Sequence, residues 1–396
     1  MKSMYQKTMY ACFIGYIVQA IVNNFVPLLF VTFQTDYQIP LSKITLLVTM
    51  NFLIQLFVDL LSAGVISKIG YRASILIAHI LSATGLIGLT VLPTLFQQPF
   101  TGILIAVAIY AVGGGLIEVL ISPIMEACPT ENKEKAMSLL HSFYCWGHVG
   151  VILLSTAFFA AFGIGNWKIL ALIWACVPIA NTILFCRAPI YTLEGDADGK
   201  SSVKSLFCKK QFWLFLVMMT CAGASEQAVS QWASAFAEQG LGVSKAIGDL
   251  AGPMAFAACM GLSRLLYGKY GEKLHLQRFM LCSCLLCIAS YLCIAFVPIP
   301  VFGLLGCAVC GFSVGILWPG TYSIAAVSLK GGGTAMFALL ALAGDLGCAG
   351  GPTLAGFLSS RFGNDLHRGI FGAIVFPVLM LCGVLLLSKK KKSENT

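Results

Sequence analysis

Charged residues are scarce in this chain, since Asp, Glu, Lys and Arg together make up only 10% of its 396 residues. Soluble domains usually carry about 25% charged residues. Hydrophobic residues make up 58% of the sequence, more than one soluble core of this length could bury. The composition therefore excludes an ordinary soluble protein and favours a membrane protein that crosses the bilayer many times.

Motifs of the common enzyme and cofactor classes are also lacking. Gly331-Gly332-Gly333 has neither the lysine nor the following serine or threonine of a phosphate-binding loop. Cys307 and Cys310 have the spacing of a metal or redox pair, but no second pair or flanking histidine accompanies them. No nucleophile with a nearby base is evident. We expect no enzyme activity, no metal and no cofactor.

Two remaining features have a membrane explanation. Sixteen cysteines would indicate disulfides in a small secreted domain, but many lie inside apolar stretches such as residues 281–287, where we expect free, packed thiols. The net charge of +9 would suit a nucleic-acid partner if the basic residues formed a patch, yet they are scattered among short loops and one tail. We therefore expect no nucleic-acid binding.

Twelve apolar stretches are long enough to cross a bilayer as helices, for which about 20 residues are needed. The first has no small-residue cleavage site, so we expect a span and not a signal peptide. The expected spans are residues 9–33, 42–66, 72–93, 101–128, 136–163, 168–187, 211–238, 247–270, 276–297, 301–328, 333–360 and 370–388. The sequence thus predicts an all-α integral membrane protein.

The distribution of lysine and arginine sets the expected orientation. Most of these residues lie at the termini and in the loops after even-numbered spans. The opposite loops and their borders hold Lys43, Lys168, Lys245, Arg361 and Arg368. By the positive-inside rule, both termini are expected to be cytoplasmic. We expect a plasma (inner) membrane of bacterial type.

The longest polar segment divides the chain into six spans plus six. It contains Glu194, Asp196 and a run of small polar residues, so residues 188–210 are expected to form a flexible cytoplasmic linker. We expect an N-terminal six-helix bundle over residues 1–187 and a C-terminal bundle with a basic tail over residues 211–396.

The two halves are similar in sequence. At an offset of 200, Gly147 and Gly150 of span 5 match Gly347 and Gly350 of span 11. Spans 1 and 7 match at an offset of 208, and spans 4 and 10 at 196. Three matches in one order indicate two pseudo-symmetric repeats and resemble the major facilitator fold. That resemblance implies a solute site near the midplane between the halves, which rock about it.

Glu118 lies near the middle of the apolar segment 101–128, which contains no lysine or arginine. A charge at that depth costs roughly 2.5 to 3.5 kcal/mol on insertion scales, and it is retained mainly where it serves a cavity, a partner or a proton path. Glu226 and Asp345 are further acids inside predicted spans. Because burial disfavours the charged form of a carboxylate, all three are expected proton-coupling residues.

Amide side chains occupy matched positions in the first span of each half. Gln19 and Asn23 share a helix face, as do Gln227 and Gln231. Amides suit a hydroxyl-rich solute, and aromatic rings suit a sugar face. Both also serve ordinary helix packing or interface anchoring. The candidate substrate-binding residues are Gln19, Asn23, Asn24, Glu118, His141, Trp146, Glu226, Gln227, Gln231, Trp232, Trp318 and Tyr322.

Three charged residues near the predicted cytoplasmic ends are candidates for gating. Asp59 and Arg264 occupy similar positions in spans 2 and 8, which suggests a charge pair or two loop anchors. Arg72 follows span 2 and is the third candidate. The superfamily's loop motif is degenerate here, because Ser67 stands where aspartate is usual.

Histidines in the predicted spans are candidates for proton relay or solute contact. His141 and His148 lie seven apart in span 5 without a third ligand, which makes a poor metal site. His79 is expected to pack or to face a neighbouring helix.

The glycine run 113–115, followed by Glu118 and Pro123, resembles the fourth-helix motif of the fucose permease-like branch of the superfamily. The resemblance continues in residues 22–24, 69–72 and 140–147. It implies a proton-coupled symporter of a sugar or similar solute, with Glu118 in recognition and coupling. The aspartate that follows the helix-1 asparagines of the fucose permease is missing, since residues 25–27 are Phe-Val-Pro. Sodium therefore remains an alternative coupling ion.

Two functions fit these features. The first is a secondary active transporter that moves a small polar solute by alternating access, with proton symport; the matched amides favour it. The second is a proton-coupled multidrug or metabolite antiporter, which the three intramembrane acids favour. A sensor would need a signalling domain for which we expect no room. The expected partners are the solute, the coupling ion and the lipid bilayer, and a monomer suffices.

Overall fold

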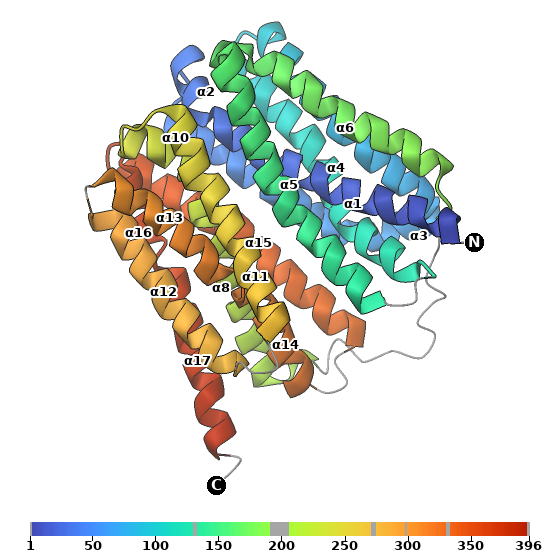
Figure 1. Cartoon of the computed structure of the whole chain (residues 1–396), viewed down its shortest axis with the longest axis vertical. Helices are drawn as coiled ribbons and strands as arrows, with labels where there is room; N and C mark the ends of the chain where they lie inside the picture. The colour runs from blue at the N-terminus through green and yellow to red at the C-terminus, as the bar shows by residue number, and fades with distance from the viewer. Residues whose placement is uncertain are drawn as a thin grey trace. The chain divides into compact units, whose positions relative to one another are not determined.

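The structure is a computed structural model that describes residues 2–129, 133–190, 206–270, 275–297, 299–329 and 333–393 (Figure 1). Within these ranges all regular secondary structure is helical. Twelve helical segments of this described part are long and apolar enough to cross a membrane. The prediction of an all-α protein with twelve spans is therefore confirmed.

The chain forms two compact units, Met1–Gly195 and Asp196–Thr396. The boundary falls inside the predicted linker 188–210, and residues 191–205 of that linker lie outside the described part of the chain. Each unit contains six of the twelve spans.

Unit 1 is built from six spans, two of which depart from simple helices. Span 1 is interrupted by a 3₁₀ turn at Pro27, which has no backbone N–H to donate. Spans 2 and 3 form one long helix that turns at Gly70, whose φ of 80° suits glycine. The elements are α1 (Lys2–Asn24), η1 (Val26–Leu29), α2 (Phe30–Asp36), α3 (Leu41–Leu95), α4 (Pro99–Ala127), α5 (Lys133–Phe162), η2 (Ile164–Asn166) and α6 (Trp167–Arg187).

Unit 2 has more interruptions than the hydropathy pattern predicts. Spans 7 and 8 each contain a turn of π-helix, and span 10 breaks at Gly315–Ile316. The elements are α8 (Lys210–Ser230), α9 (Ala233–Ala235), η3 (Phe236–Gly240), α10 (Lys245–Asp249), η4 (Leu250–Met254), α11 (Ala255–Tyr270), α12 (Leu276–Phe296), α13 (Pro300–Val314), α14 (Leu317–Ser328), α15 (Gly333–Arg361), α16 (Leu366–Gly372) and α17 (Val375–Ser393).

Matched glycines pack the same pairs of spans in both units. A Cβ at Gly147 of α5 would lie 3.2 Å from Ile17 Cα of α1, and one at Gly347 of α15 would collide with Thr220 O of α8. Span 5 thus packs on span 1 as span 11 packs on span 7. The sequence repeat therefore corresponds to a repeat in helix packing, as expected from the pseudo-symmetry.

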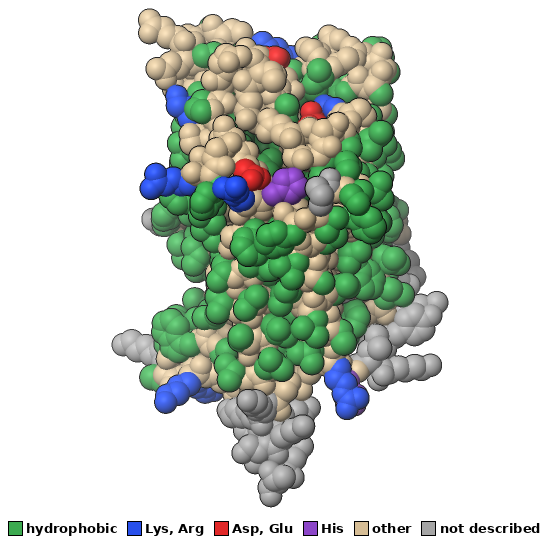
Figure 2. Space-filling model, turned by 90° about the vertical axis from the view of Figure 1, so that its left-hand side faces the viewer, with side chains coloured by type: hydrophobic (Ala, Val, Ile, Leu, Met, Phe, Trp, Pro, Cys, Tyr) green, Lys and Arg blue, Asp and Glu red, His purple; other side chains and the backbone are tan. Residues whose placement is uncertain are grey.

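The surface carries the apolar side chains that lipid requires. Figure 2 shows a broad zone of hydrophobic side chains on one face, with Lys and Arg side chains lying above and below it. Large apolar residues stay exposed, including Leu61 at 66%, Leu95 at 70% and Phe296 at 64%. Lipid, and not water, is the natural solvent of such a surface.

Arg72 anchors the end of span 6. Its guanidinium donates to Phe185 O at 2.9 Å, Cys186 O at 3.1 Å and Ala188 O at 2.9 Å. These carbonyls belong to the last turn of α6 and the residue after it, where helix carbonyls lack intrahelical partners. The structure therefore places this candidate gating residue as a cap within unit 1.

We expect Arg72→Lys to lower the free energy of unfolding by about 1 to 2 kcal/mol, because one ammonium cannot reproduce the guanidinium fork. The measurement is the melting temperature of the purified protein in detergent. Arg187→Lys, an exposed arginine at the same helix end, is the matched control. Equal shifts for the two variants would contradict the capping role.

Candidate functional site

Glu118 of α4 ends a chain of hydrogen bonds that crosses three helices. Gln19 Nε2 of α1 donates to Glu118 Oε2 over 3.1 Å and to Gln55 Oε1 of α3 over 3.0 Å. Gln55 Nε2 donates to Asn23 Oδ1 over 2.8 Å. Asn51 Nδ2 donates to the same oxygen over 3.2 Å. We call these five residues the amide–carboxylate network.

Local sequence patterns place the network on facing helix surfaces. Gln19 and Asn23 are four residues apart on α1, and Asn51 and Gln55 are four apart on α3, so each pair shares one helix face. The first pair was predicted from the sequence and the second was not, although the same spacing is visible in span 2. A search for amides four apart inside apolar spans would have found both pairs.

The glycine run of α4 allows the helices to approach closely. A Cβ at Gly114 would lie 3.2 Å from Gln19 Oε1, and one at Gly115 would lie 3.1 Å from Gln55 Cα. A Cβ at Gly113 would press on Ala78 of the second half of α3. The predicted fourth-helix motif therefore has a physical role: it lets Glu118 reach the amides of α1 and α3.

The network is buried except at its acid. The four amide residues Gln19, Asn23, Asn51 and Gln55 are each less than a tenth exposed, whereas Glu118 is half-buried. One helical turn away, the hydroxyls of Tyr16 and Ser122 lie 2.9 Å apart. The carboxylate is therefore the more accessible end of a buried polar chain.

Other candidates in unit 1 lie outside this network. Asn24 is buried and donates to Ala20 O of its own helix over 2.9 Å. Trp146 of α5 is 54% exposed. Asp59 of α3 is half-buried. The side chain of His141 lies outside the described part of the structure.

His79 fixes three helices of unit 1, as expected from its position. Its Nδ1 lies 2.8 Å from Ile75 O, and its Nε2 lies 2.8 Å from Asn181 Nδ2 of α6. Asn181 Nδ2 also donates to Ala11 O of α1. These partners require a neutral ring that donates from Nδ1 and accepts at Nε2. His148 of α5 is buried as well, and among the described residues its Nδ1 has no hydrogen-bonding partner.

Glu226 of α8 is the centre of a second polar group, in unit 2. Its Oε2 lies 3.6 Å from Arg264 Nη2 of α11, and its Oε1 accepts from Gln227 Nε2 over 3.2 Å. Gln231 Nε2 donates to Gln227 Oε1 over 3.1 Å. Arg264 Nε also donates to Gly315 O over 3.3 Å, at the break in span 10. Four of the predicted residues therefore lie together.

The Glu226–Arg264 pair predicts a measurable coupling between the two side chains. Replacing Arg264 alone by glutamine leaves a buried carboxylate without its cation, so we expect a clear loss of stability. The double variant Glu226→Gln/Arg264→Gln should recover part of that loss, which gives a coupling energy of about 1 kcal/mol. Melting temperatures of the wild type, both single variants and the double variant measure it. Additive losses would rule out the pair.

The aromatic candidates of unit 2 occupy different environments. Trp232 is fully buried and donates to Pro352 O over 2.9 Å. Trp318 and Tyr322 of α14 form an edge-to-face pair with centroids 6.3 Å apart. The Trp318 ring packs against Gly344 of α15, next to the half-buried Asp345.

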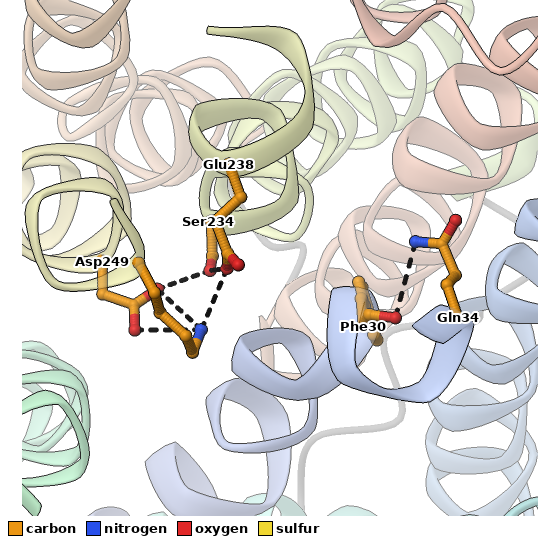
Figure 3. Close-up of polar contacts among 6 residues, drawn as sticks. Phe30, Gln34, Ser234, Glu238 and Asp249 are labelled. Atoms are coloured by element: carbon orange, nitrogen blue, oxygen red, sulfur yellow. Dashed lines mark hydrogen bonds and ion pairs between the residues drawn. The ribbon is translucent and has the colours of Figure 1, made fainter. Parts of the chain in front are cut away.

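An ionic cluster that was not predicted from the sequence lies where spans 7 and 8 join. Lys245 Nζ lies 3.1 Å from both Glu238 Oε1 and Asp249 Oδ2, and the hydroxyl of Ser234 donates toward the two carboxylates (Figure 3). Asp249 is fully buried. The Lys245/Asp249 spacing of four residues was a visible signal, but Lys245 was interpreted as a loop residue.

The part of the chain that the structure describes has no geometry suited to a metal site or a disulfide. There, no group of three or more His, Cys, Asp or Glu side chains is arranged to hold a metal ion. The sixteen cysteines are free thiols.

Three solved structures whose titles name a transporter or symporter share this architecture. A bacterial homolog of the human lysosomal transporter Spinster, inward-facing and unoccupied, matches with a TM-score of 0.79 at 15% identity, over 98% of each chain. The xylose transporter of E. coli, partially occluded and inward open, matches with a TM-score of 0.73 at 13% identity, over 98% of each chain. The E. coli fucose:proton symporter matches with a TM-score of 0.65 at 15% identity, over 96% of this chain and 98% of that chain.

These likenesses show the fold alone, and they do not distinguish the branches of the family. No curated protein matches the sequence. The profile of the Major Facilitator Superfamily matches residues 12–352, which is most of the chain. This family consists of membrane transporters and not of enzymes. By its sequence and its fold, the chain belongs to the major facilitator superfamily.

Proposed function

We propose that this transporter moves a sugar or similar small polar solute by alternating access, coupled to a proton. The observation that carries the proposal is the amide–carboxylate network, in which Gln19 links Glu118 to Gln55. Amides offer both donors and acceptors to hydroxyl groups. The carboxylate beside them offers a site for a proton.

Coupling follows from the chemistry of that link. A charged Glu118 accepts the hydrogen bond from Gln19 Nε2. When Glu118 binds a proton, its negative charge is neutralised and its attraction for the amide weakens. Gln19 is then available to a solute hydroxyl, so proton and solute favour the same loaded state. The loaded protein moves between its two orientations more readily than the partly loaded one.

Glu118 is a better candidate for the coupling proton than Glu226. Glu118 is half-buried at the more accessible end of its network, whereas Glu226 is less than a tenth exposed and lies 3.6 Å from Arg264. In this proposal Glu226, Arg264, Gln227 and Gln231 form the solute-contacting or gating group of unit 2, and Asp345 remains a further proton site.

The proposal also includes the orientation of the chain in the membrane and the two bundles that move during transport. Both termini are placed in the cytoplasm of a cell with a plasma membrane of bacterial type, because basic residues favour that side. The bundles 1–187 and 211–396 move as the two halves, joined by the linker 188–210. The amide–carboxylate network of unit 1 and the polar group around Glu226 in unit 2 lie on matched spans, which supports this division.

An antiporter of cationic solutes is the second candidate. The observation that favours it is the half-buried carboxylate of Glu118, which would attract a cationic group of a solute. In that case the proton and the cation would compete for Glu118 instead of binding together.

Uptake by reconstituted vesicles distinguishes the two functions. The panel contains labelled hexoses, deoxyhexoses and amino sugars and one cationic dye, each with and without an inward proton gradient. Gradient-driven accumulation of one sugar class would support the symporter. Dye export without sugar movement would replace it by the antiporter, and sugar uptake that follows sodium and ignores pH would identify sodium as the coupling ion.

A further inference from the structure

His367 lies between backbone carbonyls of two other spans. The residue is in the first turn of α16, where span 12 begins. Its Nδ1 lies 2.8 Å from Ile294 O, in the last turn of α12, and its Nε2 lies 3.2 Å from Gly240 O, at the end of η3. The ring also packs edge-on against Phe236, with centroids 4.8 Å apart and planes at 73°. One side chain thus joins spans 7, 9 and 12 within unit 2.

Both ring partners of His367 are acceptors, and this fact determines the chemistry. A backbone carbonyl oxygen cannot donate a hydrogen bond, and a neutral imidazole has only one N–H. A neutral ring therefore satisfies one carbonyl and turns the lone pair of its other nitrogen toward the second. An imidazolium donates to both. We propose that His367 is a proton-binding site whose occupation ties the ends of spans 7, 9 and 12 together.

The backbone around His367 is fixed in a way that keeps the ring in place. Asp365 caps α16: its Oδ1 accepts from His367 N over 2.9 Å and from Arg368 N over 3.4 Å. Its Oδ2 lies 3.1 Å from Arg368 Nε. On the other side, Gly240 has no Cβ, and one built there would lie 3.5 Å from His367 Nε2. That distance is an ordinary contact, but the same Cβ would lie 2.9 Å from the Phe236 ring, so glycine leaves room for the ring that packs on His367.

The segment that His367 holds is the π-helical end of span 7. Its other side is held by the ionic cluster, in which Glu238 of η3 meets Lys245 at the start of span 8. The end of span 7 is therefore tied to span 8 by charge and to spans 9 and 12 by the histidine. Loss of the proton removes one of the two histidine hydrogen bonds and leaves the ionic cluster intact, so the segment is released on one side only.

Other titratable groups lie near the ring, and most of them have partners of their own. On the surrounding elements they are Glu238 of η3, Cys293 of α12, Arg361 of α15, and Asp365 and Arg368 of α16. Glu238 contacts Lys245, Asp365 contacts Arg368, and the Cys293 thiol donates to Phe302 O. The contacts at the two ring nitrogens are to backbone carbonyls. Protonation of the ring itself is what changes the number of bonds.

The number of hydrogen bonds that the ring donates sets the direction in which pH changes the tie between the spans. The protonated ring makes two hydrogen bonds and the neutral ring makes one, so the tie is complete at lower pH and is weakened as the ring loses its proton. Histidine is the side chain whose charge ordinarily changes between about pH 5 and about pH 8. This inference does not depend on which solute is carried or on proton coupling at Glu118.

The test compares His367→Gln with His275→Gln in the full-length protein in detergent. Glutamine does not titrate, and its hydrogen-bond donors are on one atom only. His275 serves as the control because it is an exposed histidine of the same unit. The quantity compared is the melting temperature at about pH 5.5 minus that at about pH 7.5. We expect this difference to be about 2 to 4 °C more positive in the wild type and in His275→Gln than in His367→Gln. The same pH dependence in all three proteins would overturn the proposal.

A second measurement applies even if His367→Gln does not fold. In wild-type protein labelled with ¹⁵N-histidine, the His367 signals should show two N–H groups at the lower pH and one at the higher pH. Hydrogen exchange of residues 241–244, corrected for the intrinsic effect of pH, should become faster as the second N–H is lost. A single N–H throughout this pH range would contradict the proposal.

Discussion

Glu118→Gln is expected to reduce gradient-driven uptake by about tenfold or more, which is the usual range for loss of coupling between two ligands. Glutamine has nearly the same shape, and its carbonyl oxygen can still accept from Gln19 Nε2. The variant should therefore fold and keep the network while losing the ability to bind and release a proton. Uptake by reconstituted vesicles, with and without a proton gradient, is the measurement.

Two companion variants sharpen this prediction. Asp36→Asn removes an exposed carboxylate at the end of α2 and should leave uptake unchanged. Glu118→Asp retains an acid but shortens its reach toward Gln19, so it should weaken solute affinity more than it changes pH dependence. A properly inserted Glu118→Gln protein with the pH dependence of the wild type would rule out Glu118 as the coupling site.

Gly347→Ala is expected to have the largest effect on folding. The added methyl group would collide with Thr220 O, a backbone atom of α8 that cannot turn aside. Thr220 Oγ1 also donates to Ala343 O over 2.9 Å, so the two helices are held at close range. Overpacking of this kind costs about 1 to 3 kcal/mol and exceeds the gain of up to about 1 kcal/mol in helix propensity.

Gly350→Ala is the matched control, because a Cβ at Gly350 has open space around it. The same gain in helix propensity applies there without the collision, so this variant should melt at the wild-type temperature or above it. The yield of monodisperse protein and its melting temperature in detergent are the measurements. Destabilisation of both variants to the same extent would show that close packing at Gly347 is not the cause.

The sequence by itself determined the spans and their number. These features are local, because a bilayer requires about 20 consecutive apolar residues for each crossing whatever the neighbouring helices do. The matched glycines were also visible, and Gly147 and Gly347 indeed pack the same pairs of spans. Glu118 was identifiable for the same reason: a charge in an apolar span is costly wherever its partner lies.

The tertiary structure decided which side chains meet. Gln19 contacts Gln55 and Glu118, which lie 36 and 99 residues away in the sequence, and hydropathy carries no information about the rotation of one helix against another. Asn24, adjacent to Asn23, turns to its own backbone instead of joining the network. A shift of one residue moves a side chain by about 100° around the helix.

Partners in unit 2 were hidden for the same reason. Arg264 meets Glu226 across two helices, and His367 meets carbonyls of residues 127 and 73 positions away. Hydropathy also could not predict the breaks in spans 7, 8 and 10. An apolar stretch has the same hydropathy whether its helix is regular or contains a π-turn. Composition and periodicity thus determined what crosses the membrane, and helix rotation and close packing decided which polar groups share a hydrogen bond.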